Sequence, residues 1–300
     1  MRILVTGASG FIGQRLLGQL AGERHEVWAL TRDSRPVTGA SATVVGDLAR
    51  GPIDVKAAAP EAVVHLAGEP VAGHRWSGER KARIRDSRVL GTRHLAESLA
   101  SLAVPPSVAV VASGVGYYGD RGDELLTETS AKGEGFLADV CEAWEAEAEK
   151  LLPAGRVVSL RLGFVLGKRG GGLPPLARPF RLFAGGPIGG GRQWMSWIHL
   201  DDVCGLVRHA LARDDARGPV NAVGPEPLRN RDVAKLVGRI LGRPSFLPVP
   251  APALRLLLGS QMARELLLAS QRVLPERARA LGYEFLFPDP EAAFRAALEE

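Results

Sequence analysis

Cysteine, tyrosine and long apolar runs are scarce in this chain of 300 residues. The scarcity of cysteine and that of apolar runs each exclude a class of protein. The two cysteines, Cys141 and Cys204, show neither metal-ligand spacing nor a disulfide framework, so we expect two buried thiols and no metal site. No apolar stretch approaches the roughly 20 residues that span a bilayer, and the amino terminus follows a strand pattern rather than a signal-peptide pattern. We therefore expect a cytoplasmic protein with no membrane partner.

The excess of positive charge is small, with 38 Lys and Arg against 33 Asp and Glu. The densest basic stretch, residues 75–88, also contains Glu79 and Asp86. We read this stretch either as the solvated face of a helix or as a segment from which a few residues meet cofactor phosphates, and we expect no nucleic-acid partner. Apolar residues make up 46% of the chain, which is typical of a globular protein with a large core.

The most informative segment is a glycine turn, Gly7-Ala8-Ser9-Gly10-Phe11-Ile12-Gly13, which joins the apolar strand pattern at 2–6 to a helical run at 14–20. One glycine permits the tight reversal, one lets backbone amides reach a pyrophosphate, and one lets the helix pack closely on the strand. The phosphate then lies at the positive end of the helix. With a second strand at 26–31, this spacing predicts dinucleotide binding; the alternative is a glycine-rich turn without a ligand.

Strand and helix patterns alternate along the first half of the chain. Further strands are predicted at 43–45, 62–66, 108–112 and 157–162, and long helices at about 77–102 and 135–152. This alternation predicts a doubly wound parallel sheet of the Rossmann type, with ligands at the carboxyl ends of its strands. After Gly167, glycines and prolines interrupt the pattern. We expect a dinucleotide-binding domain at 1–166, with 194–215 packing back onto it, and a smaller, mostly helical substrate lobe at 167–193 and 216–300.

Taken in order, the motifs resemble the extended, epimerase-type short-chain dehydrogenase/reductases over essentially the whole chain. The matching segments are the glycine turn and residues 46–48, 65–68, 113–119, 197–203 and 218–221. A narrower resemblance, to epimerase family proteins without an assigned substrate, rests on residues 67–69, 87–88, 116–119, 144–145 and 179–181.

The resemblance implies a role for each matching position around a nicotinamide coenzyme. The pyrophosphate is expected on Gly7, Gly10, Phe11, Ile12 and Gly13. The adenine is expected beside Asp47 and Leu48, and the ribose and nicotinamide side beside Leu66, Ala67 and Gly68. By position rather than by resemblance, Glu69, just past the fourth strand, is a candidate to contact ribose hydroxyls or to serve as a base, and Arg88 is a candidate to contact the cofactor.

The end of the second strand favours NADP over NAD. An NAD enzyme places an acid there to accept a hydrogen bond from the ribose 2′-hydroxyl, whereas this chain has Thr31 and Arg32, with Arg35 close behind. A guanidinium suits a 2′-phosphate and can stack on adenine. Asp33 stands beside Arg32, but as the next residue its side chain can point elsewhere. The alternative is that Arg32 is only a solvent-exposed loop residue.

The catalytic pattern of the resembling family is missing. Its oxidising and epimerising members carry Tyr-x-x-x-Lys on a helix, which places phenol and ammonium on one face. None of the six lysines here has a tyrosine four residues earlier. Helical spacing of Leu137, Cys141, Trp144, Ala148 and Leu151 indicates a core stripe in that helix instead.

Two residues remain as catalytic candidates. Ser113 holds a substrate oxygen or caps a strand end, and Tyr117 reaches the nicotinamide or packs under the lobe. His199 is read as structural. The sequence therefore predicts an NADP(H)-binding oxidoreductase or epimerase acting on a small polar or sugar-like substrate. The alternative is a catalytically silent NADP(H)-binding sensor or partner protein. The resemblance also implies a possible homodimer.

Overall fold

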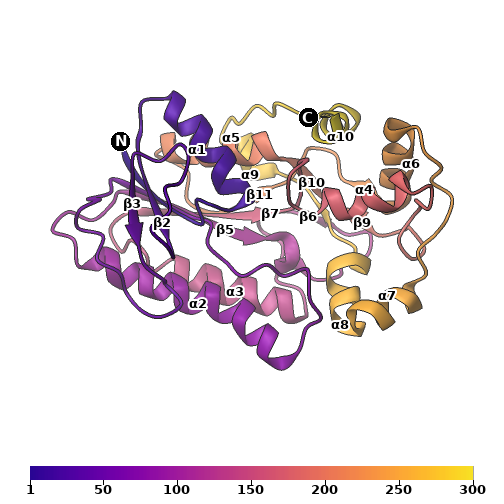
Figure 1. Cartoon of the computed structure of the whole chain (residues 1–300), viewed down its shortest axis with the longest axis horizontal. Helices are drawn as coiled ribbons and strands as arrows, with labels where there is room; N and C mark the ends of the chain where they lie inside the picture. The colour runs from indigo at the N-terminus through magenta and orange to yellow at the C-terminus, as the bar shows by residue number, and fades with distance from the viewer. Residues whose placement is uncertain (300) are drawn as a thin grey trace.

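The computed structural model describes residues 1–299, which are built around one seven-stranded parallel sheet (Figure 1). The strand order is β11-β7-β5-β4-β1-β2-β3, and every neighbouring pair is parallel. The strands are β1 (Arg2–Thr6), β2 (Glu26–Thr31), β3 (Ala42–Val45), β4 (Ala62–His65), β5 (Val108–Gly114), β7 (Arg156–Leu162) and β11 (Gly218–Ala222). This is the doubly wound Rossmann sheet that the alternating pattern predicts, and strand order reverses between β1 and β4.

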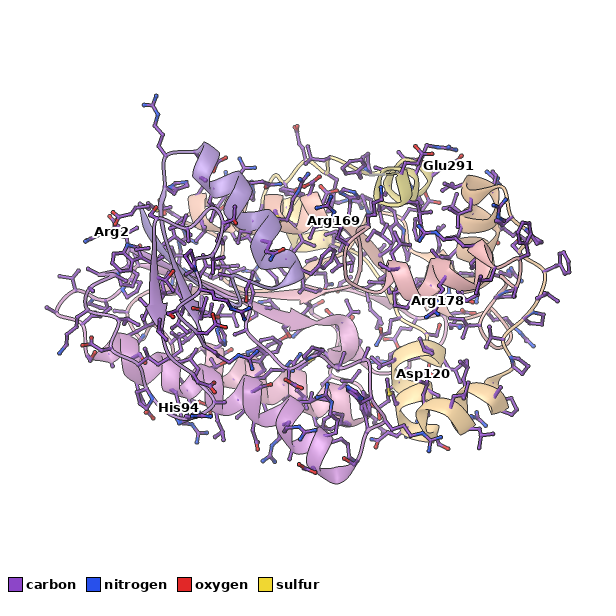
Figure 2. All side chains as sticks on the ribbon, viewed as in Figure 1. Arg2, His94, Asp120, Arg169, Arg178 and Glu291 are labelled. Carbon is purple, nitrogen blue, oxygen red and sulfur yellow. The ribbon has the colours of Figure 1, made fainter. Side chains whose placement is uncertain are left out.

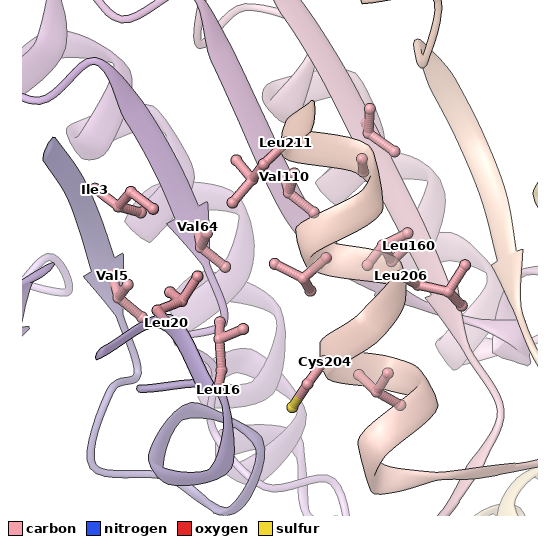
Figure 3. Packing of buried hydrophobic residues seen from close by; sticks show 14 of the residues in the cluster. Ile3, Val5, Leu16, Leu20, Val64, Val110, Leu160, Cys204, Leu206 and Leu211 are labelled. Carbon is pink, nitrogen blue, oxygen red and sulfur yellow. The ribbon is translucent and has the colours of Figure 1, made fainter. Parts of the chain in front are cut away.

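Helices cover both faces of the sheet because its strands are apolar on both sides. Figure 1 shows α1 (Phe11–Gly22) and α5 (Leu200–Ala212) above the sheet, and α2 (Gly78–Ala100) and α3 (Phe136–Ala148) below it. Alternate residues of β1 belong to the two cores: Ile3 and Val5 face Leu16 and Leu20 of α1, as Figure 3 shows, whereas Leu4 lies in the cluster that contains Trp144. Because successive side chains of a strand point to opposite faces of the sheet, each strand packs against both helix layers.

A third core belongs to the lobe at the right of Figure 1, where Trp197, Phe180 and Phe294 are almost fully buried. Its main helices are α4 (Leu173–Arg181), α6 (Asn230–Leu241) and α10 (Pro290–Glu299). The remaining elements are η1 (Val115–Tyr118), α7 (Ala251–Leu258), α8 (Ser260–Met262), the π-helical η2 (Ala263–Leu268) and α9 (Glu276–Ala280). Two-stranded pairs join β8 (Phe164–Leu166) to β10 (Trp197–His199), β9 (Trp194–Met195) to β12 (Leu228–Arg229), and β6 (Leu125–Leu126) to β13 (Arg272–Val273).

The observed elements differ from the sequence-based expectations at one strand assignment and at the ends of several elements. Strand β11 lies inside the stretch 216–300 expected for the lobe, yet it pairs with β7 as an edge strand of the central sheet. The boundary at residue 216 is therefore wrong for this strand, while the division into two domains stays a prediction. The helix expected at 135–152 ends at Ala148, and that expected at 77–102 is shorter by a residue or two at each end.

Both cysteines are free and buried, as the sequence analysis expects. Within residues 1–299, no helix has the length and apolar character that a membrane crossing requires. The same residues contain no cluster of three or more His, Cys, Asp or Glu that could hold a metal ion.

Candidate functional site

The turn between β1 and α1 leaves no room for side chains at two of its glycines. Gly7 has a φ of +69°, and a Cβ there would lie 2.7 Å from the Leu66 carbonyl carbon after β4. A Cβ at Gly13 would lie 2.3 Å from the Gly7 carbonyl oxygen. Only glycine allows these approaches, which bring the start of α1 close to the ends of β1 and β4.

The start of α1 has no side-chain cap. Gly10 is its N-cap and makes no side-chain cap hydrogen bond, and the first turn contains no acidic residue. The first amides of this helix therefore keep the donors and the positive potential that favour a phosphate. The Phe11 ring packs against the loop after β8, because a Cβ at Gly167 or Gly170 would lie within 2.6 Å of that ring. Figure 2 labels Arg169 in this loop.

A buried hydrogen-bond chain fixes the adjacent end of β4. Thr6 Oγ1 accepts from the Ala67 amide at 3.2 Å and lies 2.6 Å from His65 Nδ1. His65 Nε2 lies 3.0 Å from Thr92 Oγ1, which also accepts from the Trp144 indole at 3.0 Å. Burial lowers the pKa of His65 to about 4, so its ring is neutral at physiological pH. The backbone at 66–68 thus has a defined position beside the glycine turn.

At the end of β2, the acid Asp33 pairs with one of the two nearby arginines and not with the other. Thr31 donates to the Asp33 carbonyl oxygen at 2.6 Å. The Asp33 carboxylate accepts from the Arg35 amide at 3.1 Å and from its guanidinium at 2.7 Å, and this side-chain hydrogen bond lowers the pKa of Asp33. Arg32 is exposed and has no ion-pair partner among residues 1–299. The free charge at this strand end is therefore the Arg32 guanidinium.

The expected adenine-side residues follow β3. The Asp47 carboxylate accepts from the Ala49 amide at 3.0 Å, so it stabilises its own turn. Leu48 is buried, and its carbonyl oxygen lies 2.7 Å from His94 Nδ1 on α2. These contacts fix the loop after β3 against α2, at the same edge of the sheet as the glycine turn.

Two arginines of α2 contact the segment after β4. Arg80 is buried, forms an ion pair with the Glu69 carboxylate and donates to the Pro70 carbonyl oxygen. Arg88 Nη1 donates to the carbonyl oxygens of Glu69 and Ile84 at 2.9 and 3.0 Å. Because its carboxylate is engaged by Arg80, Glu69 is poorly placed to serve as the base that the sequence analysis considers for it.

A second ion pair lies at the ends of β5 and β7. Ser113 Oγ donates to Glu145 Oε1 of α3 at 2.6 Å, and Arg161 donates to both oxygens of that carboxylate at 2.9 and 2.7 Å. Arg161 Nη1 also donates to the Tyr118 hydroxyl at 2.9 Å, and this hydroxyl donates to Asn221 Oδ1 at 2.7 Å. Burial raises the pKa of Tyr118 to about 12. The network joins three strand ends to α3.

Tyr117, a catalytic candidate from the sequence, is part of the packing around this network. The centroid of its ring lies 3.5 Å from the guanidinium carbon of Arg161, and the ring meets the Tyr118 ring edge to face. It also packs against the small apolar cluster that contains Val223 and Val273. The structure therefore brings Ser113 and Tyr117 to the same ion pair: Ser113 bonds to Glu145, and the Tyr117 ring packs on Arg161.

Glu145 and Arg161 were not predicted from the sequence, and Cys141 was predicted only as a core residue. Cys141 and Glu145 are four residues apart on α3, so they share a face, and Cys141 Sγ would lie 3.7 Å from a Cβ at Gly114. Burial raises the pKa of Cys141 to about 11, which keeps the thiol protonated. The signal available in the sequence was the spacing of four, which is also the spacing of Tyr-x-x-x-Lys. Nothing local indicated the partner Arg161.

The fold and this site define a class: a doubly wound dinucleotide-binding protein of the extended short-chain dehydrogenase/reductase type. The chain belongs to the NAD dependent epimerase/dehydratase family, whose model matches residues 3–224. Residues 249–297 match a domain of unknown function, which covers much of the lobe that follows β12.

Individual relatives are similar over nearly the whole chain. The chain is 38% identical to the chloroplastic epimerase family protein SDR39U1 homolog of Arabidopsis thaliana, over 100% of this chain and 87% of that protein. It is 35% identical to human epimerase family protein SDR39U1, over 98% of this chain and 99% of the human protein. The crystal structure of the human protein (isoform 2), solved with NADPH, has a TM-score of 0.91 and 34% identity and is covered completely in both directions.

Proposed function

We propose that this chain binds NADP(H), with the pyrophosphate on the start of α1 and the nicotinamide side at the ends of β4 and β5. The observation that carries the proposal is the open start of α1 behind a turn from which Cβ atoms are excluded. Arg32, which has no ion-pair partner in the described part of the chain, favours the 2′-phosphate over a free hydroxyl, and the NADPH in the crystals of the human relative supports the same choice.

The chain's own residues have defined tasks in this proposal. The amides of the glycine turn hold the pyrophosphate, Asp47 and Leu48 flank the adenine, and residues 66–68 line the ribose. A bound nicotinamide coenzyme supplies a hydride donor or acceptor. The region around Ser113 and Cys141 then faces the substrate, which we propose is small and polar or sugar-like.

Ser113 and Cys141 have complementary hydrogen-bonding roles here. Because the Ser113 hydroxyl donates its hydrogen bond to Glu145, its oxygen is left to accept a hydrogen bond from a substrate hydroxyl. The protonated Cys141 thiol is a weak donor. The activity that this set supports is oxidoreduction or epimerisation in which binding and orientation matter more than a strong base.

Two measurements test the proposal in order. Calorimetry with NADPH and NADH tests binding, and absence of heat with both coenzymes would refute it. Turnover is then followed as loss of NADPH absorbance with a panel of small carbonyl compounds. Oxidation of NADPH by any of them, abolished by Gly10→Val, supports the oxidoreductase.

One observation favours the second candidate, a catalytically silent NADP(H)-binding sensor or partner protein. The face of α3 that points to the end of β5 carries Cys141 and Glu145, and the carboxylate is neutralised by Arg161. Neither residue replaces an activated phenol as a base. Tight NADPH binding without turnover at any pH would favour this candidate over the first.

The remaining expectations are proposals about the whole chain. We propose a homodimer through α2 and α3, the helices after β4 and β5, and a cytoplasmic location. Light scattering tests the dimer directly, and a monomeric mass at all concentrations would contradict it.

A further inference from the structure

Three arginines and two glutamates lie near the ends of β4 and β5. They come from α2, α3, β7 and the segment after β4, and there is one arginine more than the glutamates can pair with. Glu69 pairs with Arg80, and Glu145 pairs with Arg161. Arg88 has no carboxylate partner among residues 1–299. This set, which we call the arginine cluster, therefore carries one positive charge without a counterion.

Arg88 occupies a defined position in the cluster. A Cβ at Gly68 would lie 3.2, 3.3 and 3.4 Å from Cζ, Nη2 and Nη1 of Arg88, so the guanidinium lies broadside against that glycine. The centroid of the Trp144 ring lies 4.9 Å from Cζ of Arg88. Nη1 is held by the carbonyl oxygens of Glu69 and Ile84. Packing and two hydrogen bonds thus fix the plane of the guanidinium.

The other edge of the guanidinium makes no hydrogen bond within residues 1–299. Neither Nε nor Nη2 has an acceptor among residues 1–299, and neither atom is among the fully buried unpaired nitrogens of those residues. These two nitrogens present parallel N–H donors on one edge, the geometry that matches the two oxygens of a carboxylate. Arg88 therefore offers a preorganised fork rather than a mobile surface charge.

The charge itself favours an anion at this position. Burial lowers the pKa of Arg88, and Arg80 adds to the effect, yet a guanidinium stays protonated at neutral pH. A partly dehydrated cation without a counterion is unfavourable, and an incoming anion relieves that cost. Glu69 relieves this cost only in part: it raises the pKa of Arg88, but its carboxylate forms its ion pair with Arg80, and the Glu145 carboxylate forms its ion pair with Arg161.

We propose that Arg88 binds a carboxylate of the substrate through Nε and Nη2, beside the segment 66–68 that lines the nicotinamide side. The inference rests on the proposed function and deepens it. It narrows the substrate from small and polar to a small carbonyl or hydroxy compound that bears a carboxylate. A coenzyme phosphate has related anionic chemistry, and the experiment separates the two.

The test uses oxamate as the carboxylate probe and oxamide as its neutral analogue. Each is titrated by calorimetry into the full chain saturated with NADPH. We expect oxamate to bind at least about tenfold more tightly than oxamide, and Arg88→Met to lose about tenfold or more in oxamate affinity, because a charge-assisted bidentate contact is removed. Arg88→Lys is expected to fall between them, because it keeps the charge and loses the fork.

Arg85→Gln is the matched control, because Arg85 is on the same helix, exposed and paired with Asp86. It should leave both affinities unchanged, and NADPH affinity should stay within about twofold in every variant. Equal binding of oxamate and oxamide, or of oxamate to wild type and Arg88→Met, would overturn the inference. Loss of NADPH affinity in Arg88→Met would instead assign Arg88 to the coenzyme. If wild type bound no NADPH, the proposed function would fail first.

Discussion

At the level of single residues, Arg32 and Asp33 are adjacent and oppositely charged, but they differ in how their charges are paired. Asp33 is held by the side chain and amide of Arg35, whereas Arg32 has no ion-pair partner among residues 1–299. The pair with Arg35 is largely exposed and contributes little stability, but it directs the carboxylate toward its own turn. The sequence left open which of these charges meets a coenzyme.

We predict that Arg32→Glu weakens NADPH binding by about ten- to a hundredfold, because it removes charge-assisted hydrogen bonds to a phosphate. NADH affinity should change far less. Calorimetry with both coenzymes checks the difference, and Asp33→Asn serves as control, because the amide oxygen can keep the bond to the Arg35 amide. Equal losses of NADPH and NADH in Arg32→Glu would contradict the assignment of the 2′-phosphate.

His65 predicts how the stability depends on pH. Its folded-state pKa of about 4 lies below the ordinary value of 6.5, so the unfolded chain binds the proton more readily. The free energy of unfolding should therefore fall as pH drops from about 6.5 to about 4, by about 3 kcal/mol from this residue. Denaturant unfolding across that window measures it. His65→Gln should show a flatter profile, and an unchanged slope would sink the prediction.

At the scale of elements, the contact between β1 and α1 depends on a glycine that the helix itself does not need. Gly13 lies in α1, where alanine is the better helix former, but its Cβ would collide with the Gly7 carbonyl oxygen. Gly18 lies in the same helix, and a Cβ there meets nothing within 4 Å. The two positions form a matched pair.

Gly13→Ala should destabilise the fold by about 1–3 kcal/mol, because overpacking forces strand and helix apart. Gly18→Ala should stabilise it by about 0.5–1 kcal/mol through helix propensity alone. Chemical denaturation of both variants tests this opposition. A destabilised Gly18→Ala or a stabilised Gly13→Ala would show that the turn is looser than its geometry indicates.

At the scale of the whole molecule, the sheet and the lobe are joined by several crossings of the chain. The chain leaves the sheet after β7, returns at β11, and ends with α10 packed in the lobe core near Trp197. Because the sheet takes its edge strand from beyond part of the lobe, we expect the two to unfold together.

We therefore predict one cooperative thermal transition that shifts as a whole with coenzyme. NADPH at about a hundred times its dissociation constant should add about 2.7 kcal/mol to the free energy of unfolding. Scanning calorimetry with and without NADPH measures the shift. Two transitions of which only one moves would show that the lobe unfolds independently.

Much of the sheet and its phosphate end could be predicted from the sequence. Gly7, Gly10 and Gly13 impose local backbone requirements, and the strand at 108–112 is apolar enough to identify. The lobe boundary at 216 was harder to predict from the sequence, because β11 is a short strand whose place in the sheet depends on its partner β7. The candidate site was only half predictable: Ser113 and Tyr117 were identified, but not the ion pair that joins them.

The alternation of strands and helices, the uncapped start of α1 and the lack of Tyr-x-x-x-Lys can all be read from the chain, because strand periodicity, glycine conformation and residue identity are local properties. The pairing of the charges depends on the folded arrangement. Glu145 meets Arg161 and Glu69 meets Arg80, and Arg88 has no carboxylate partner within residues 1–299. An ion pair forms only where particular strand ends and helix faces converge. The distance between its two charges therefore depends on several segments and cannot be deduced from any one of them.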